Sequence, residues 1–176
     1  WQQAGYDYQL SINLTAYHLS TSEFFDWFKN QIKQFPNIDT RRFQIEILES
    51  NRLSDLSQIS NIVEFCKSEF GITTALDDFG TGYSALSYLT KLPIDTLKID
   101  ASFIAKVPDE YGNSEIVSAI VTLAKSLNIH VVAEGVEKVE QLNYLQGLNC
   151  DTIQGYYFCR PITKQQWYDF YLNTQT

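Results

Sequence analysis

The stretch TALDDFGTGYSAL, Thr74–Leu86, places two adjacent aspartates where an apolar run ends and follows them directly with two glycines. An apolar run stopped by polar residues and glycine predicts a buried strand, here over residues 72–77. A short helix is expected over residues 83–91, before Pro93. Two neighbouring carboxylates repel each other unless a cation lies beside them. The stretch therefore predicts a strand-to-helix unit with a charged cluster at the carboxyl end of the strand.

The rest of the chain repeats this alternation of β-rich runs and amphipathic segments. Further strands are expected over residues 8–13, 43–48, 95–99, 130–134 and 152–158, and further helices over residues 55–70, 114–127, 139–148 and 165–172. Phe24, Phe25, Phe28 and Ile32 mark the helix after the first strand, Ser20 and Glu23 have the spacing of a capping box, and Asn113 is expected to cap its helix. Such βα units build either an open doubly wound sheet or most of an eight-stranded barrel. The first strand runs into INLTAYHL rather than a GxGxxG turn, which counts against the open sheet.

Composition narrows the class of protein. The chain has 176 residues, 44% of them hydrophobic, which suits one domain with one core. Its net charge of −8 argues against partners that are nucleic-acid polymers or anionic membranes. Cys66, Cys150 and Cys159 form no CxxC pair, so neither a disulfide framework nor a zinc site is expected, and a cytoplasmic location fits best. The sequence contains no methionine, and we expect it to be part of a longer protein, for which an anchor in the inner membrane is one arrangement.

Polar side chains that can bind a metal or a phosphate end every expected strand. A single such residue is more often a solvated charge or a helix cap, but six strand ends in a row are harder to explain in this way. Because the carboxyl ends of barrel strands meet at one face, we expect these residues to converge. They are Asn13, Glu46 with Glu49, Asp77 with Asp78, Lys98 with Asp100, Glu134 with Glu137, and Gln154.

The carboxylates indicate a two-cation site. Glu46 lies inside the apolar run FQIEIL, where an unpaired carboxylate is costly. Two cations would satisfy both Asp77 and Asp78, and the oxygen ligands of this set suit Mg²⁺ or Mn²⁺ rather than zinc. Lys98 either pairs with Glu46 or Asp100, or holds the attacking water or the phosphate, and we favour the second role.

The other candidates support this site. Glu134 is a ligand of the second cation or a general base, and Gln154 is a hydrogen-bonding support. The segment Gly80, Thr81, Gly82, Tyr83 and Ser84 either forms a tight turn or brings backbone N–H groups close to a phosphate. His18 and His130 have no partner spacing for a zinc site or a triad, and both are expected to be structural.

The segments SINLTAYHL, FQIEILES, LDDFGTGYSAL, PIDTLKID, VVAEGVE and IQGYYFCRP resemble, in order, those of the EAL-domain family of cyclic di-GMP phosphodiesterases. The resemblance implies a modified TIM-like (β/α)₈ barrel, of which about six of eight strands lie in this chain. It implies hydrolysis of the bacterial second messenger cyclic di-GMP to linear pGpG with two Mg²⁺ or Mn²⁺ ions. A homodimer and a covalently linked sensor or diguanylate cyclase (GGDEF) domain are also expected. The alternative is a catalytically silent EAL module that binds cyclic di-GMP or another protein.

The resemblance also implies a role for each residue. Asn13, Glu46 and Asp77 would hold the first metal, and Asp78 and Glu134 would complete the second, with Asp77 bridging the two. The catalytic residues would be Lys98, Glu134 and Asp78, while Glu49 would anchor the loop after Asp77, and Glu137 and Gln154 would support the site. Residues 1–176 would form an EAL domain whose name-giving glutamate lies upstream. Thr15 replaces a usual serine and Leu48 a usual threonine, and Leu48 removes a hydroxyl near the metal.

Overall fold

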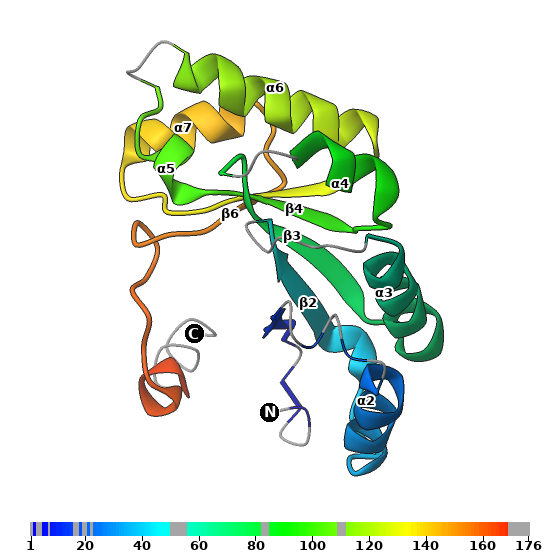
Figure 1. Ribbon diagram of the computed structural model, residues 1–176. Helices are drawn as coiled ribbons and strands as arrows, with labels where there is room; N and C mark the ends of the chain where they lie inside the picture. Colours follow the sequence, from blue (N-terminus) through cyan, green and yellow to red (C-terminus); the bar gives the residue numbers. More distant parts are fainter. Residues whose placement is uncertain are drawn as a thin grey trace.

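The computed structural model describes residues 2, 5–6, 8–15, 18, 21, 23–49, 56–81, 85–108 and 112–168. Within them, strands and helices alternate along the chain (Figure 1). The strands are β1 (Leu10–Leu14), β2 (Phe43–Leu48), β3 (Thr73–Phe79), β4 (Thr96–Ile99), β5 (His130–Ala133) and β6 (Thr152–Ile153). The helices are α2 (Phe24–Lys33), α3 (Leu56–Phe70), α4 (Ala85–Lys91), α5 (Ala101–Ile104), α6 (Asn113–Ser126) and α7 (Val139–Gly147), with a 3₁₀ turn η2 (Thr40–Arg42) before β2. A further helical segment covers residues 164–168.

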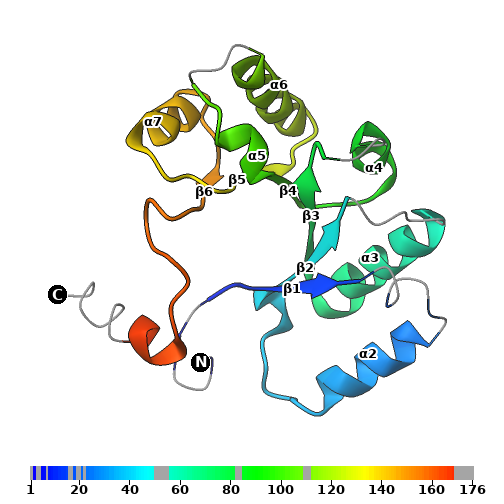
Figure 2. The ribbon, with the colours of Figure 1, turned by 60° about the vertical axis from the view of Figure 1, so that its left-hand side comes forward.

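The six strands form one parallel sheet in sequence order, from β1 to β6. Successive βα units produce this order, so it confirms the predicted α/β architecture with six strands. Figure 2 shows the strands curving around a common centre with the helices outside them. Among the described strands, β1 pairs only with β2, and β6 only with β5. The sheet is thus the wall of a TIM-like barrel that these strands do not close.

The apolar core lies between the sheet and the helices. In β2, Ile45 and Ile47 are buried against this core, which includes Ile62 of α3. Gln44 and Glu46 alternate with them and therefore lie on the inner face of the curved sheet, where they are also buried. The Gln44 amide donates to the Thr96 hydroxyl at 2.9 Å. The inner face is thus polar, which is the environment in which a charged site can form.

Aromatic side chains join the two described ends of the chain. The rings of Tyr8, before β1, and Trp167, in the last helical segment, have centroids 4.5 Å apart. Tyr6 completes a triangle with these two rings, 5.7 Å from Tyr8 and 5.8 Å from Trp167. Ring contacts therefore hold the segment before β1 against the last described helical segment.

The last strand is shorter than the sequence predicts, because β6 ends at Ile153 rather than near residue 158. The chain turns around Val136, whose N–H donates to Gln154 O at 3.0 Å and whose carbonyl accepts from Tyr157 N–H at 2.9 Å. A Cβ atom at Gly155 would lie 2.1 Å from the Val136 oxygen. Glycine at this position permits a close backbone approach that a continuing strand would not make.

Helix starts also differ from the predictions. Asn113 is the first residue of α6 and not its cap; Gly112 occupies the cap position, and its N–H donates to the Glu115 carboxylate at 2.6 Å. Glycine suits this position because φ is +98°. Glu23 is itself the N-cap of α2, so it is not the third residue of a capping box begun at Ser20, which lies outside the described residues.

Candidate metal centre

A β-bulge brings the adjacent aspartates to the same site. Leu76 of β3 pairs with Leu97 of β4, but the next pair is Phe79 with Ile99. Two residues of β3, Asp77 and Asp78, therefore oppose the single residue Lys98, which is the arrangement of a bulge. Asp78 has a φ of +56°, outside the strand region. The bulge explains how two neighbours in a strand place both carboxylates on the inner face, since regular alternation would send one of them outward.

Lys98 lies at the centre of the cluster. Its Nζ is 2.8 Å from Asp77 Oδ1, 2.9 Å from Glu134 Oε1 and 3.0 Å from Glu46 Oε1. The lysine side chain is only 10% exposed. Burial alone lowers the pKa of Lys98, but the hydrogen bonds that its ammonium donates to the three carboxylates outweigh burial and raise the pKa above its ordinary value. The ammonium is therefore charged at neutral pH and compensates part of the negative charge around it.

Two carboxyl groups of the cluster have raised pKa values. Burial raises the pKa of Glu134, and although Lys98 lowers it, the neighbouring Asp77 and Glu46 raise it further. Burial also raises the pKa of Asp78, with added repulsion from Asp77 and Asp100. The four carboxylates thus carry more negative charge than one ammonium balances.

The donor set fits divalent cations. Asp77, Asp78 and Glu134 each offer an oxygen, and these three oxygens lie within 4.8 Å of one another. Hard oxygen donors at this spacing are the ligands that Mg²⁺, Mn²⁺ and Ca²⁺ take in proteins. Asn13 pairs in register with Glu46 across β1 and β2, so its amide stands beside the cluster on an exposed strand. The site could therefore hold cations through carboxylate and amide oxygens.

Glu49 ties the bulge to the neighbouring strand. Its N–H donates to Asp77 O at 3.0 Å, and its carboxylate accepts from Gly80 N–H at 2.7 Å. The Thr81 hydroxyl donates to Asp78 O at 2.9 Å. Leu48 pairs with Asp77 in register, and the Glu49 contacts form with leucine at that position. Gly82, Tyr83 and Ser84 lie outside the described residues.

Within the part of the chain that the structure describes, no side-chain hydrogen bond or ion pair links Glu137 or Gln154 to the cluster. Glu137 is exposed, and its N–H donates to the Gln141 amide oxygen at 2.8 Å. Gln154 is exposed, and its N–H donates to Ala133 O at 2.9 Å. Of the two alternative partners predicted for Lys98, Glu46 is in contact with it at 3.0 Å, whereas Asp100 accepts the Ser102 N–H at 3.0 Å and caps α5.

Sequence reasoning missed Gln141 and the helix α5. Gln141 is 2% exposed, and its amide links α7 to Ile104 O at 3.0 Å. No local pattern in VEQL distinguishes this glutamine from a solvated one, because its partners lie far away in the sequence. The two histidines contact threonine hydroxyls: His18 contacts Thr15 at 2.9 Å within one turn of chain, and His130 of β5 contacts Thr152 of β6 at 2.8 Å.

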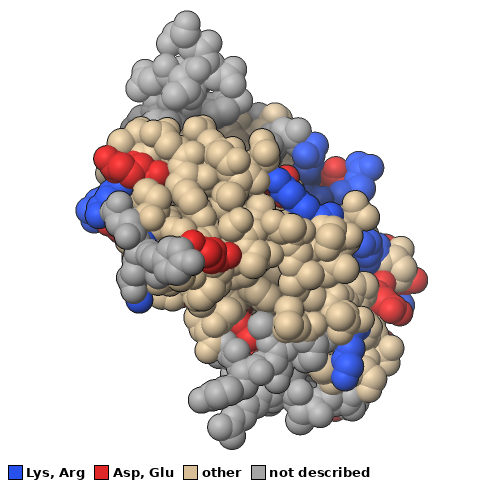
Figure 3. All heavy atoms as spheres, turned by 90° about the horizontal axis from the view of Figure 1, so that it is seen from above, with Lys and Arg blue, Asp and Glu red and all other residues tan. Residues whose placement is uncertain are grey.

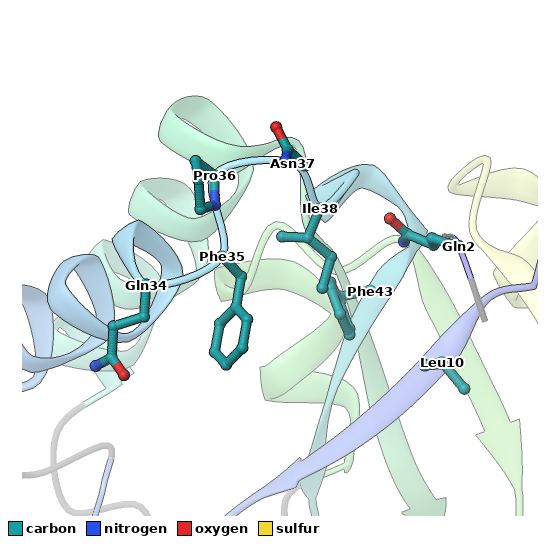
Figure 4. A pocket seen from close by; sticks show the side chains of 8 residues that line it. All are labelled: Gln2, Leu10, Gln34, Phe35, Pro36, Asn37, Ile38 and Phe43. Atoms are coloured by element: carbon teal, nitrogen blue, oxygen red, sulfur yellow. The ribbon is translucent and has the colours of Figure 1, made fainter. Parts of the chain in front are cut away.

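A separate cavity of about 310 Å³ lies at the opposite end of the sheet (Figure 4). Leu10 and Phe43, the first residues of β1 and β2, line it together with Phe35 and Ile38. Its described lining contains no titratable side chain. The described lining therefore lacks groups that could take part in acid–base chemistry.

The molecular surface gives no sign of a broad basic region on the face shown in Figure 3. On that face, the described acidic and basic side chains lie scattered among uncharged surface.

None of the described helices is both long enough and apolar enough to cross a lipid bilayer.

Comparison with known proteins places this geometry in a family. The sequence model of the EAL domain matches residues 1–161. The bifunctional diguanylate cyclase/cyclic di-GMP phosphodiesterase MucR of Pseudomonas aeruginosa is 35% identical over 167 residues, which are 94% of this chain and 24% of MucR. The chain thus spans about a quarter of the length of this curated relative.

Solved structures share the fold. The EAL domain of Mycobacterium smegmatis DcpA is 32% identical with a TM-score of 0.88, covering 98% of this chain and 78% of that one. Klebsiella pneumoniae BlrP1, in its complex with manganese and cyclic di-GMP, is 30% identical with a TM-score of 0.79, covering 91% of this chain and 41% of that one. These likenesses confirm the predicted TIM-like fold class. Because the family's sequence model matches most of its length, the chain belongs to the EAL domain family.

Proposed function

We propose that the protein hydrolyses cyclic di-GMP to linear pGpG with the help of two Mg²⁺ or Mn²⁺ ions. The observation that carries the proposal is the bulge that gathers Asp77 and Asp78 with Glu134 around Lys98. MucR is named for cyclic di-GMP hydrolysis, and BlrP1 binds manganese together with cyclic di-GMP. A phosphodiester carries negative charge, so an acidic site needs cations to bind it.

The roles of the chain's own residues follow from their places. Asn13, Glu46 and Asp77 would hold the first cation, and Asp78 and Glu134 the second, with Asp77 shared. When bound, the two cations would stabilise charge on the phosphate and make water a better nucleophile at neutral pH.

Lys98 can act on the substrate only after it is released from some of its carboxylates. Its ammonium is a donor with three hydrogens, each now directed at a carboxylate oxygen. A hydrogen freed in this way would orient the attacking water or a phosphate oxygen. Glu134, whose carboxylate lies 2.9 Å from the Lys98 ammonium, is the group that could accept a proton near this position.

The surrounding residues would support the site. We assign anchoring of the bulge to Glu49 through its bond to Gly80, and contact with substrate or loop to Thr81, Gly82, Tyr83 and Ser84. Glu137 and Gln154 are assigned the same supporting role. Residues 1–176 are proposed to act as one EAL domain.

We further propose that the domain works in the cytoplasm as a homodimer, in a protein that also carries a sensor or diguanylate cyclase domain. The support for the linked domain is the bifunctional name of MucR, of which this chain covers 24%. Light scattering of the natural protein tests the dimer, and a monomer at micromolar concentration would contradict it.

The experiment is cyclic di-GMP turnover by the natural protein with Mg²⁺, with Mn²⁺ and with chelator. Linear pGpG should form only with a cation, and Asp78→Asn should abolish its formation. Asp26→Asn is a matched control, because it makes the same charge change at an exposed position of α2. No product from the wild type with either cation would refute the proposed reaction, and full turnover by Asp78→Asn would refute the role of the cluster.

A further inference from the structure

A short helix, α5, contacts the chain just after Asp78, at the end of β3, and just after Glu134, beyond the end of β5. The helix covers Ala101–Ile104. Its N-cap, Asp100, lies two residues after Lys98 in the sequence. Its outer neighbours are glycines, one from each loop: Gly80 follows the bulge in β3, and Gly135 follows Glu134. The contacts on both sides are close enough to decide which residues can occupy these positions.

The first contact is between Phe103 of α5 and Gly80. A Cβ atom at Gly80 would lie 2.7 Å from Cε2 and 2.9 Å from Cζ of the Phe103 ring. Gly80 also has a φ of +101°, which only glycine adopts at low cost. The ring therefore lies directly on the backbone two residues after Asp78, at the N–H that donates to Glu49.

The second contact is between Ala101 and Gly135. A Cβ atom at Gly135 would lie 2.5 Å from the Ala101 Cβ and 3.2 Å from its Cα. The φ of Gly135 is +71°. The start of α5 thus rests on the backbone of the residue that follows Glu134.

The buried amide of Gln141 makes a third contact. Its Nε2 donates to Ile104 O, at the end of α5, while its Oε1 accepts the N–H groups of Glu137 at 2.8 Å and Lys138 at 3.0 Å. One side chain therefore ties the end of α5 to the loop that leaves Glu134. The Ile104 side chain is fully buried, which fixes this end of the helix in the core.

We propose that α5 sets the distance between Asp78 and Glu134, with Phe103 and Gln141 as positioning residues for the second cation. The inference rests on the proposed function, because that function makes these two carboxylates ligands of one ion. The physical reason is that Asp78 lies on a bulge of β3 and Glu134 lies just beyond β5, where regular sheet pairing ends, so an element that contacts both segments can fix their spacing. Residues that hydrogen-bond to metal ligands raise metal affinity by holding the ligands in place. Residues that hold the ligands by packing should raise it for the same reason.

The test measures two quantities on the intact natural protein and its Phe103→Ala variant. In metal-free protein, backbone hydrogen exchange is followed in peptides covering residues 76–81 and 133–138. We expect faster exchange in both segments, because the contact that supports each loop is lost or loosened. Mn²⁺ titration should then show affinity about tenfold weaker than that of the wild type, the scale seen when outer-shell partners are removed.

Two matched controls separate this role from general packing. Phe65 of α3 is also half-buried against aromatic neighbours, and Phe65→Ala should lower stability without changing Mn²⁺ affinity or exchange in the two segments. Gly112→Ala and Gly80→Ala both add a methyl group at a positive φ, of +98° and +101° respectively. The methyl group at residue 112 meets no atom within 4 Å, whereas the one at residue 80 meets the Phe103 ring. Only Gly80→Ala should weaken Mn²⁺ binding, and adding Phe103→Ala to it should cost little more, because both act on one contact.

The outcomes are distinct. Unchanged exchange in either segment of folded Phe103→Ala would overturn the inference, whatever the metal result. Wild-type Mn²⁺ affinity in both folded Phe103→Ala and folded Gly80→Ala would overturn it as well. A wild type that binds no Mn²⁺ would refute the proposed function, while the exchange measurement would still decide whether α5 holds the two loops.

Discussion

Replacing Lys98 with methionine tests the charge balance of the cluster most sharply. Methionine keeps much of the length and apolar stem of lysine but removes the ammonium that contacts Glu46, Asp77 and Glu134. In the metal-free protein, the buried carboxylates of Glu46 and Asp77 and the half-buried carboxylate of Glu134 then face one another without a compensating charge. Their repulsion should appear as a loss of folding free energy at neutral pH.

The size of the loss follows from burial. Removing one partner of a buried ion pair costs about 3–5 kcal/mol, since the remaining charge stays desolvated. The Lys98 side chain is 10% exposed, so solvent screening reduces this figure little. Lys67 offers a control, because its Nζ lies 2.5 Å from Asp95 but its side chain is 52% exposed. An exposed pair contributes only about 0–1 kcal/mol, so Lys67→Met should change stability far less.

The assay is urea unfolding of wild type and both variants, without metal and with saturating Mn²⁺. A divalent cation among the carboxylates supplies the charge that Lys98→Met lacks, so Mn²⁺ should stabilise this variant more than the wild type and shrink the difference between them. Equal midpoints of wild type and Lys98→Met without metal would refute the reasoning. A difference that Mn²⁺ leaves unchanged would also contradict it, because the carboxylates would then not share the cation.

Three further predictions concern the loop, the thiols and the pH dependence. Glu49→Ala removes the acceptor of the Gly80 N–H, and the variant should remain folded. A Mn²⁺ titration of this variant should show affinity about tenfold weaker than that of the wild type. Burial raises the pKa of the Cys66 thiol to about 12, so in native protein a thiol reagent should label exposed Cys159 and leave Cys66 unlabelled until denaturant is added. Because burial raises the pKa of Glu134, protons compete for it at a higher pH than for an ordinary carboxylate; Mn²⁺ affinity measured from about pH 8 to about pH 5 should therefore start to fall above the usual carboxyl range.

The order of strands and helices could be predicted from the sequence because each element is encoded by the pattern of its own residues. Strands buried between helices appear as apolar runs, and helices as amphipathic segments, so six βα units were recognisable in order. The end of β6 was not, because Tyr156 and Phe158 continue an apolar run although the chain has already turned at Gly155. The turn depends on hydrogen bonds with Val136, and the sequence around Gly155 does not indicate contacts with so distant a residue.

Part of the candidate site could also be predicted from the sequence, and part of it could not. That polar strand ends meet at one face follows from parallel topology, so Glu46, Asp77, Asp78 and Glu134 could be grouped before the structure was seen. The bulge, in contrast, depends on the register between two strands, which no single run of sequence contains. The three-way pairing of Lys98 and the contacts of α5 likewise depend on residues distant in the chain.

The most direct test of the central claim is cyclic di-GMP hydrolysis in ¹⁸O-labelled water by the natural protein with Mn²⁺. The account predicts linear pGpG with one ¹⁸O on its terminal phosphate, formed by the wild type and not by Asp78→Asn. Cyclic di-GMP that remains intact with the folded, Mn²⁺-loaded wild type would contradict it.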